Sequence, residues 1–280
     1  DDGFSPILSG GDCDDLNPNI HPDALDIPGN EVDEDCDGKL SRAVATQDDA
    51  SQWPIPLKEL GFRPPYSVVM VTIESLRADH IGFYGYGKET TPAIDDLAAQ
   101  SVVFKNAYSV SSAPQTALSS ILSGRYPSEL KRSRDFFPAY HGDNRFLAEI
   151  LAEQRFHSAA FPSHWYFKEG SGLEQGFGIW QPYAVEKGRM RFVPTAETVV
   201  TAAVEHLHRL APDPERPYLL WLHIIDPQPR YISHLDVPRF GDSMLDRYDH
   251  ELRYVDTWLD WFFETLKRRE DWSRTVVVLT

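Results

Sequence analysis

The distribution of apolar and polar positions after residue 66 predicts strands and helices in alternation. Apolar, β-branched runs at 67–73, 218–224 and 275–280 are typical of strands buried on both faces. The expected helices are 92–100, 116–123, 144–154, 195–210 and 243–268, with a further strand at 157–161 and a strand and loop at 101–110. We therefore expect an α/β fold with a largely parallel or mixed central sheet flanked by helices.

Residues 1–42 differ in composition from the rest of the chain. Asp, Gly, Pro and Asn are dense there, and the only two cysteines of the sequence, Cys13 and Cys36, both lie in this segment. A segment this short and polar cannot fold by burial alone, so a covalent or metal cross-link is expected. The sequence thus predicts a small module at 1–42, a Pro-containing linker at 43–65 and a main domain at 66–280.

The acidic residues of the small module follow a metal-binding spacing. Alternate carboxylates in D-x-D-x-D-G, ending at Gly38, form the first half of a calcium loop, but Val44 stands where an EF-hand has its bidentate Glu. The whole pattern resembles the Asp/Cys-rich calcium-binding repeats of bacterial extracellular proteins. This resemblance implies bound calcium, a Cys13–Cys36 disulfide and an oxidising compartment, while an acidic disordered linker is the alternative. The expected calcium ligands are Asp12, Asp14, Asp33, Asp35 and Asp37.

Charge and hydropathy narrow the classes of partner. The formal net charge is −16 and no basic face is visible, so nucleic acid is not an expected partner. No run reaches the ~18–20 apolar residues of a membrane span, and the first residues lack the order of a secretory signal. The run at 275–280 ends without a turn. We interpret the chain as a fragment of an extracellular, periplasmic or cell-surface protein, and membrane association of the parent chain stays open.

Glu74 directly follows the first strand of the main domain. Open α/β sheets bind their ligands at the carboxyl ends of the strands, so a carboxylate there is placed to bind a metal or a substrate. A hydroxyl-rich segment, 109–116, precedes a short apolar helix that Gly124 ends. Together these features predict a metal-assisted nucleophile. A Glu that only caps the following segment is the alternative.

The stretch VTIESLRADHIGFYGYGKETTPAIDDLAAQSVVFKNAYS, with SGRYPSE, GLEQGF and YLLWLHIIDP further on, resembles the sulfatase family of the alkaline phosphatase superfamily. The resemblance covers nearly all of 66–280 and extends to the phosphoethanolamine transferases. It implies an alkaline phosphatase-like fold and a divalent metal, with calcium as the expected ion and Mg, Mn or Zn as alternatives. Glu74 matches the first metal carboxylate, and the remaining ligands would follow Thr280. Asp79 and His80 would support the neighbouring loop.

The nucleophile can be placed in three registers. Sulfatases carry Cys or Ser in C/S-x-P-x-R and convert it to formylglycine; here Ser112 and Pro114 are kept, but Thr116 replaces the Arg. Alignment without gaps to the phosphoethanolamine transferases also selects Ser112, and Thr116 at the expected helix start is the reserve. A third register, anchored on Gly124, puts Pro114 at the nucleophile position and describes a pseudoenzyme. Arg125 matches a family arginine that supports the nucleophile loop.

His223 and Gln228 lie in LHIIDPQPRY, where the family commonly reads LH..DPH.PY. Gln228 can donate a hydrogen bond but cannot transfer a proton, and His223 is either a catalytic group or a satisfied core residue. We predict a metal-dependent hydrolase of sulfate or phosphate esters that acts on a small-molecule, glycan or lipid ester, inactive as residues 1–280 alone. The alternatives are a phospho-headgroup transferase and an inactive binding module. The predicted catalytic residues are Ser112, Thr116, Arg125 and His223.

Overall fold

The computed structural model divides the chain into two units, Asp1–Arg63 and Pro64–Thr280, and each is described by itself. The described residues are 65–135, 137–183, 195–213, 215–228 and 231–280, together with Cys13, Ile20, Val32, Asp33, Cys36 and Gly38.

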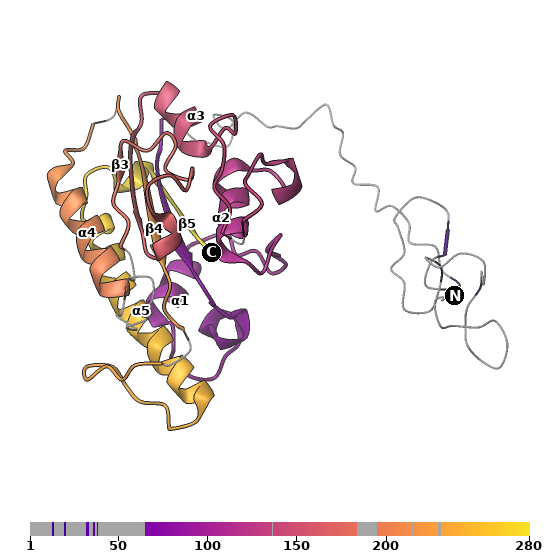
Figure 1. The fold of residues 1–280 in the computed structure, drawn as a ribbon. Coiled ribbons are helices and arrows are strands. Elements are labelled where there is room, and N and C mark those ends of the chain that lie inside the picture. The colour runs from indigo at the N-terminus through magenta and orange to yellow at the C-terminus, as the bar shows by residue number, and fades with distance from the viewer. Residues whose placement is uncertain are drawn as a thin grey trace. The chain divides into compact units, whose positions relative to one another are not determined.

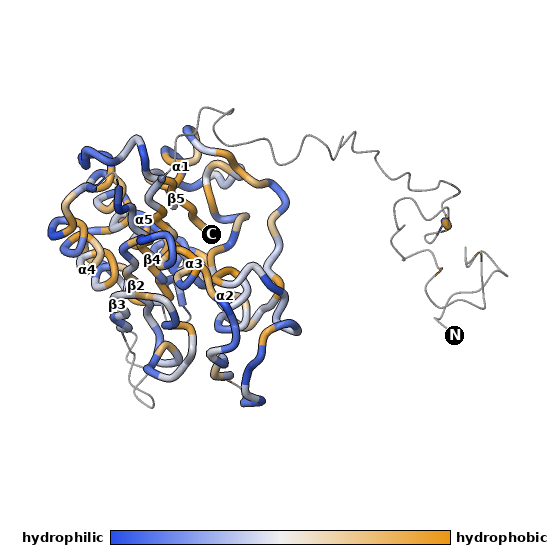
Figure 2. Tube along the Cα trace, turned by 90° about the horizontal axis from the view of Figure 1, so that it is seen from above, coloured by the Kyte–Doolittle hydropathy of each residue, from blue (hydrophilic) through white to orange (hydrophobic). Residues whose placement is uncertain are grey.

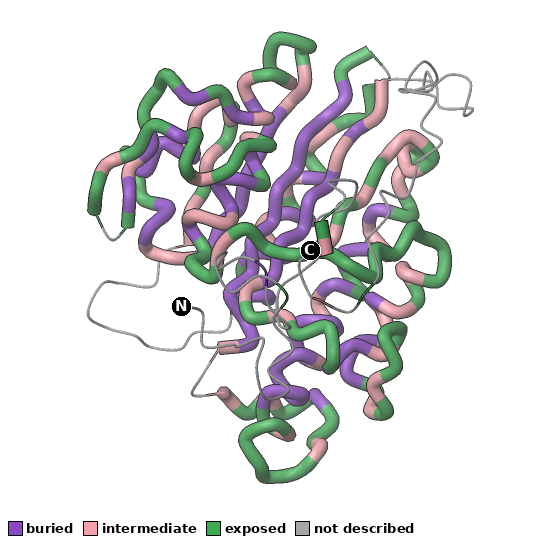
Figure 3. Tube along the Cα trace, turned by 90° about the vertical axis from the view of Figure 1, so that its right-hand side faces the viewer, coloured by how far each residue is buried: buried purple, intermediate pink, exposed green. Residues whose placement is uncertain are grey.

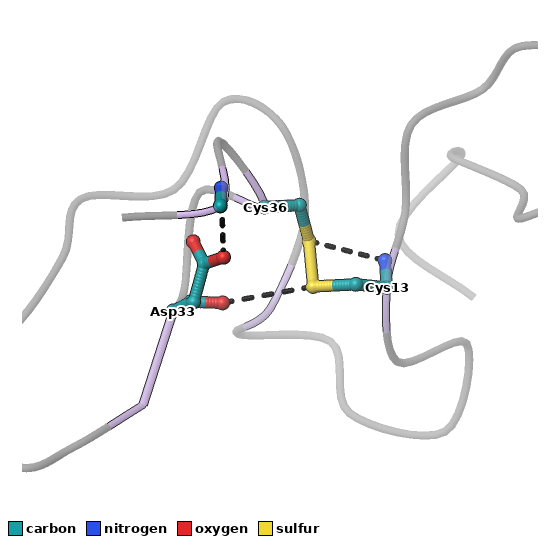
Figure 4. Close-up of a disulfide and its surroundings, with 4 residues drawn as sticks. Cys13, Asp33 and Cys36 are labelled. Atoms are coloured by element: carbon teal, nitrogen blue, oxygen red, sulfur yellow. Dashed lines mark hydrogen bonds between the residues drawn. A yellow bond between two sulfur atoms is a disulfide. The ribbon is translucent and has the colours of Figure 1, made fainter. Parts of the chain in front are cut away.

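In the first unit, Cys13 and Cys36 form a disulfide, which confirms the predicted pairing (Figure 4). Their Cα atoms are 5.7 Å apart. Beside the disulfide, Oδ2 of Asp33 accepts the N–H of Gly38 at 2.9 Å. Gly38, in this turn, has a φ of +81°, a conformation that glycine adopts readily because it has no Cβ. The expected ligands Asp12, Asp14, Asp35 and Asp37 lie outside the described residues, as does most of the predicted linker.

The second unit is built on a sheet of five parallel strands, which confirms the expected α/β class. The strands are β1 (Ser67–Ile73), β2 (His157–Pro162), β3 (Ile179–Trp180), β4 (Tyr218–Ile224) and β5 (Thr275–Leu279). Their order in the sheet is β3-β2-β4-β1-β5. Because all strands run the same way, their carboxyl ends meet at one edge of the sheet.

Helices cover both faces of this sheet (Figure 1). They are α1 (Pro92–Ala98), α2 (Pro114–Ser123), α3 (Leu147–Glu153), α4 (Ala196–Arg209) and α5 (Met244–Lys267). Side chains of α1, α4 and α5 share one hydrophobic core, whereas α2 and α3 lie on the opposite face. No helix in the described part of the chain is both long and apolar enough to span a membrane.

Successive residues of β1 point alternately into the two cores. Val69, Val71 and Ile73 belong to the core under α4 and α5, whereas Met70 packs with α2 on the other face. By the same period of two, Thr72 lies on the face of Met70. Figure 3 shows the strands buried at the centre of the unit, and Figure 2 shows hydrophilic residues mainly on its outer turns. The sheet therefore separates a face covered by α4 and α5 from the face that carries the polar groups described next.

The expected strand within 101–110 is wrong. Val102, Phe104 and Tyr108 are 82%, 71% and 88% exposed, and no backbone–backbone hydrogen bond among the described residues involves 102–110. A strand needs a neighbour for its backbone groups, and the described sheet ends at β3 and β5 on its two sides. Within the described part of the chain, this apolar segment therefore pairs with neither edge strand.

Candidate active site

Glu74 lies at the carboxyl edge of the sheet as the first residue after β1. Its N–H donates a hydrogen bond to the carbonyl of Ile224, the last residue of β4, at 2.9 Å. The side chain is 11% exposed, and by the period of the strand it lies on the same face as Thr72. The sheet itself therefore places the carboxylate at the expected ligand-binding edge.

Three side chains from other strand ends meet the Glu74 carboxylate. The hydroxyl of Tyr166, in the short turn Trp165–Phe167 after β2, donates to Oε1. Nε2 of His223, in β4, lies 3.2 Å from the same oxygen, and Nε2 of Gln228 donates to Oε2 at 3.3 Å. Sequence positions separated by about 90 to 150 residues thus converge on one group because parallel strands end at one edge.

The surroundings of Glu74 keep its carboxylate ionised. Burial alone would raise its pKa, but the hydrogen bond to His223 and the electrostatic interaction with it, the Tyr166 hydroxyl and a weaker electrostatic interaction with His164 together lower the pKa below its ordinary value. The same contact works in reverse on Tyr166, where burial and then the Glu74 charge raise the phenol pKa. At neutral pH the site therefore holds a negative Glu74 and a neutral Tyr166.

His223 is held in place from the core side. Its ring packs edge-on against Phe167 and beside Trp221, with 1% of the side chain exposed. Nδ1 lies 2.8 Å from Oγ1 of Thr72, and Nε1 of Trp221 donates to that same hydroxyl at 3.0 Å. His223 is thus a core residue with a partner on one ring nitrogen, while the other nitrogen contacts Glu74. Its catalytic role stays a prediction.

His164 belongs to the same group of residues, and the sequence analysis missed it. Its φ of 149° lies in a region that residues with a Cβ rarely adopt. Burial, and to a smaller extent the charge of His223, lower its pKa to about 4 against the opposing effect of Glu74. Nδ1 accepts the backbone N–H of Tyr166 at 3.4 Å, so Nε2 carries the proton of the neutral ring. The available signal was its position just after the strand HSAAFP, at the carboxyl edge.

The LRADH element supports the loop after Glu74 and does not contact the carboxylate. Nδ1 of His80 lies 2.6 Å from Oδ1 of Asp249 in α5, whose side chain is fully buried. Tyr86 and Lys88 donate to the other oxygen of Asp249 at 2.7 and 2.8 Å. Asp79, by contrast, is exposed and pairs with the neighbouring arginine. The predicted supporting role therefore fits the contacts of His80, whereas Asp79 makes only a surface ion pair.

The residues predicted to attack the ester lie in a different environment. Ser112 is exposed, just before α2, which begins at Pro114 rather than at the expected Thr116 because proline suits the first helical turn. Thr116 is partly exposed in that turn, and Arg125 is exposed immediately after Gly124 ends the helix. Among the described residues, no hydrogen bond or ion pair of these three side chains connects them to the Glu74 group.

Glu74 is the described residue whose chemistry fits a divalent metal. The ionised Glu74 is suited to a divalent cation by its charge and by its place at the sheet edge. Within the part of the chain that the structure describes, however, no group of three His, Cys, Asp or Glu side chains could hold a metal ion. The carbonyl of Thr280 accepts the N–H of Ile73 at 2.9 Å, so the end of β5 reaches the same edge. Glu74 thus fits as one ligand of an incomplete set.

Two family models match the sequence. A model described as "Sulfatase" matches residues 67–280, which include Glu74, His164, Tyr166 and His223. A model described as "Putative metal-binding motif" matches residues 12–41, which include both cysteines.

The chain is also similar to curated proteins in sequence and to solved structures in fold. The chain is 28% identical over 211 residues to "Putative transferase YhbX" of Escherichia coli (strain K12), covering 72% of the chain and 35% of that protein. The crystal structure of Ps i-CgsB in complex with k-i-k-neocarrahexaose matches with a TM-score of 0.66 at 16% identity, covering 77% of this chain and 58% of that one. The C-terminal periplasmic domain of EcEptC from Escherichia coli, solved in complex with Zn, matches with a TM-score of 0.54 at 15% identity over 74% and 60% of the two chains. These structures share the fold, and the chain spans about a third of the length of its curated relatives.

Proposed function

Because the chain belongs to the sulfatase family, we propose that the full-length protein is a metal-dependent hydrolase of sulfate or phosphate esters. The Glu74 carboxylate carries this proposal: it is ionised, nearly buried and held by side chains at the ends of two other strands, β2 and β4. When bound, a divalent metal polarises an ester oxygen and lowers the pKa of the attacking group. Glu74 would hold this metal as one of its ligands.

Residues of this chain would then attack the ester and orient the Glu74 carboxylate. Ser112 is the proposed attacking residue, directly or as formylglycine, and its exposure leaves the hydroxyl accessible to substrate and to modification. The His164 ring is neutral near pH 7, so it adds no positive charge that would oppose a cation at Glu74. Tyr166 and Gln228 orient the carboxylate by donating to its two oxygens.

A phospho-headgroup transferase is the second candidate, and the 28% identity to "Putative transferase YhbX" favours it. In that reaction Oγ of Ser112 would form a bond to phosphorus while the bond to the leaving alcohol oxygen breaks and the alcohol takes up a proton. An acceptor hydroxyl would then take the phospho group from Ser112 and restore the serine. The substrate is a small-molecule, glycan or lipid ester in either case, and the oligosaccharide bound to Ps i-CgsB supports a glycan.

Mass spectrometry of residue 112 in the full-length protein tests these candidates. Formylglycine together with turnover of an aryl sulfate supports the hydrolase, and a phosphoserine adduct that forms with a phosphoester donor supports the transferase. An unmodified Ser112 without turnover of either substrate would leave the inactive binding module. Ser112→Ala should abolish turnover with the fold intact, whereas loss of turnover in Thr116→Ala alone would move the nucleophile to Thr116.

The metal assignment has a separate test in the full-length protein. Glu74→Gln removes the negative charge with almost no change of shape, so bound metal and turnover should fall together, by at least tenfold. Elemental analysis of the purified protein and titration with Ca²⁺, Mg²⁺, Mn²⁺ and Zn²⁺ measure the first effect. Glu264→Gln is the matched control, because Glu264 is 43% exposed on α5. Unchanged metal content in Glu74→Gln would remove this residue from the site.

We also propose that residues 1–42 bind calcium outside the cytoplasm. The Cys13–Cys36 disulfide supports an oxidising compartment such as the periplasm or the cell surface, and the match of residues 12–41 to a metal-binding motif supports a bound ion. Calorimetric titration with Ca²⁺ against Mg²⁺ and Zn²⁺, before and after reduction, tests both points. Free thiols in protein purified from its native compartment, or no heat of Ca²⁺ binding, would contradict them.

A further inference from the structure

Glu251, on the buried side of α5, holds the loop that follows β4. One carboxylate oxygen, Oε2, accepts the backbone N–H of Gln228 at 3.3 Å. The other, Oε1, accepts the backbone N–H of Ile232 at 2.5 Å. The residue is 4% exposed, so the two amide donors replace water as partners of a buried carboxylate. One side chain therefore fixes two points of this loop.

The loop fixed in this way carries a residue of the candidate active site. The backbone N–H of Gln228 donates a hydrogen bond to Glu251, while its side-chain amide donates one to Oε2 of Glu74. We infer that Glu251 is a positioning residue of the active site, which sets where the Gln228 amide meets Glu74. This inference rests on the proposed function, in which Glu74 is a metal ligand.

Other residues hold the loop on both sides of the segment that Glu251 fixes. Before it, Oδ2 of Asp226 accepts the backbone N–H groups of Thr195 and Ala196 at 2.7 and 2.8 Å. These bonds join the start of the loop to the start of α4. Among the described contacts, Glu251 is therefore the anchor of the backbone at Gln228 itself.

After this segment, two histidines bind the loop to α5. The N–H of His234 donates to Nε2 of His250 at 2.8 Å, and Nδ1 of His250 lies 3.0 Å from the carbonyl of Pro238. The His234 ring also stacks on Tyr254, with 3.6 Å between ring centroids. The His234 side chain also reaches the Glu251 carboxylate, with 3.8 Å between Nε2 and Oε1. Because the bonds of His250 and the stacking of His234 on Tyr254 involve other partners, loss of Glu251 should loosen the loop mainly near Gln228.

Glu251→Gln isolates this effect. The variant keeps the shape of the side chain but replaces one acceptor oxygen with an NH₂ group, which faces a backbone N–H and cannot bind it. One of the two loop amides then loses its partner, and the Gln228 side chain loses its fixed approach to Glu74. In the full-length protein we expect kcat/KM for an aryl sulfate or aryl phosphate to fall about tenfold.

A double-mutant cycle with Gln228→Ala separates positioning from general damage. If Glu251 acts through Gln228, adding Glu251→Gln to Gln228→Ala should lower kcat/KM by less than about twofold further. Additive losses would overturn the inference. Glu264→Gln is the control on the same helix, because its carboxylate is exposed and pairs only with Lys267. Glu251→Asp, which keeps the charge and withdraws it by one methylene, should reproduce the loss if Glu251→Gln fails to fold.

Side-chain amide signals of Gln228 in NMR provide a readout without turnover. They should shift in Glu251→Gln, and exchange of the Gln228 and Ile232 backbone amides should accelerate, while both stay unchanged in Glu264→Gln. If these changes occur and the wild type turns over neither ester, positioning stands and the proposed function fails. If the wild type is active and the Gln228 signals do not move, Glu251 is not a positioning residue.

Discussion

Two hydroxyl groups of the main domain, those of Thr72 and Ser112, lie in opposite kinds of environment. Oγ1 of Thr72 has His223, Trp221 and the Leu222 carbonyl as polar neighbours inside the sheet. Ser112 is exposed two residues after the segment 102–110, which makes no backbone–backbone hydrogen bond among the described residues. Thr72 holds His223 beside Glu74 and Ser112 is the predicted nucleophile, but only Thr72 is fixed by its surroundings.

The difference shows what a parallel sheet can and cannot position. Ladder hydrogen bonds fix the strand ends relative to one another, so residues such as Glu74 at those ends need little further support. The segment between α1 and α2 has no such ladder, and its side chains depend on whatever packs over them. The described residues therefore preorganise the metal-binding half of the proposed site more than the attacking half.

The largest loss of stability is expected when the anchor of the loop after Glu74 is removed. Asp249→Ala removes the buried carboxylate that pairs with His80, Tyr86 and Lys88, and should lower the free energy of unfolding by about 3–5 kcal/mol. Urea unfolding of the purified protein measures it. Asp79→Ala removes an exposed ion pair with Arg77 and should cost no more than about 0.5 kcal/mol. Equal losses in the two variants would contradict the buried role of Asp249.

Stability should depend on pH through the contact between α5 and α1, the helix that precedes the exposed segment 102–110. Asp256 accepts the N–H groups of Ala93 and Ile94, yet burial outweighs these bonds and raises its pKa from 3.8 to about 6. The folded state thus binds this proton more tightly than the unfolded state. The contribution of Asp256 to stability is therefore full below pH about 4 and is lost as the pH rises to about 6.

Asp256→Asn should remove this dependence. The stability of the wild type relative to the variant should fall by about 2 kcal/mol between pH 4 and pH 7, since each pKa unit corresponds to about 1.4 kcal/mol. Urea unfolding of both proteins at four pH values provides the measurement. A relative stability that stays constant or rises over this range would show that the two N–H bonds and the ion pair with Arg253 outweigh burial.

A smaller loss is expected from the hydroxyl inside the sheet. Thr72→Val keeps the volume but leaves the Trp221 N–H and one His223 nitrogen without a buried partner, which should cost about 1–2 kcal/mol. The His223 ring should also become less well fixed beside Glu74. Thr72→Ser, which restores the hydroxyl, should recover more than half of the loss in the same unfolding experiment. A Ser variant no better than Val would point to packing as the cause.

The smallest effect is expected at the other hydroxyl. Ser112→Ala should change the free energy of unfolding by less than about 0.5 kcal/mol, because the side chain is exposed and bonds to no described residue. Hydrogen exchange should show the same asymmetry, with fast exchange at 102–110 and slow exchange in β1. Protection of 102–110 comparable to that of β1 would mean that the segment is paired in solution.

Most of the fold could be predicted because its strands are continuous apolar runs. β1 and β4 begin and end where their runs do, at 67–73 and 218–224. The two residues of β3 are too few to show any period. Residues 102–110 have a strand-like sequence, but pairing depends on a neighbour, which a local pattern cannot reveal.

The sequence could predict single residues of the candidate site, but not which of them come into contact. Glu74 was found because it directly follows a strand, and a search of the first four residues after β2 would have included His164 and Tyr166. The contact of Tyr166 with Glu74 joins positions about 90 residues apart and depends on strand order, which the sequence does not state. The roles of Ser112, Thr116 and Arg125 stay predictions.

The contacts of α5 restrict insertions and deletions in this helix more than they restrict substitutions. Tyr248 and Asp249 bond to the loop after Glu74, Glu251 bonds to the loop after β4, and Asp256 bonds to the start of α1. One residue inserted into a helix turns every later position by about 100°. An insertion after Glu251 would therefore keep the first two loops in place and swing Asp256 away from α1. Exposed positions such as Asp260 should accept many substitutions, whereas the stretch 248–256 should accept no insertion or deletion.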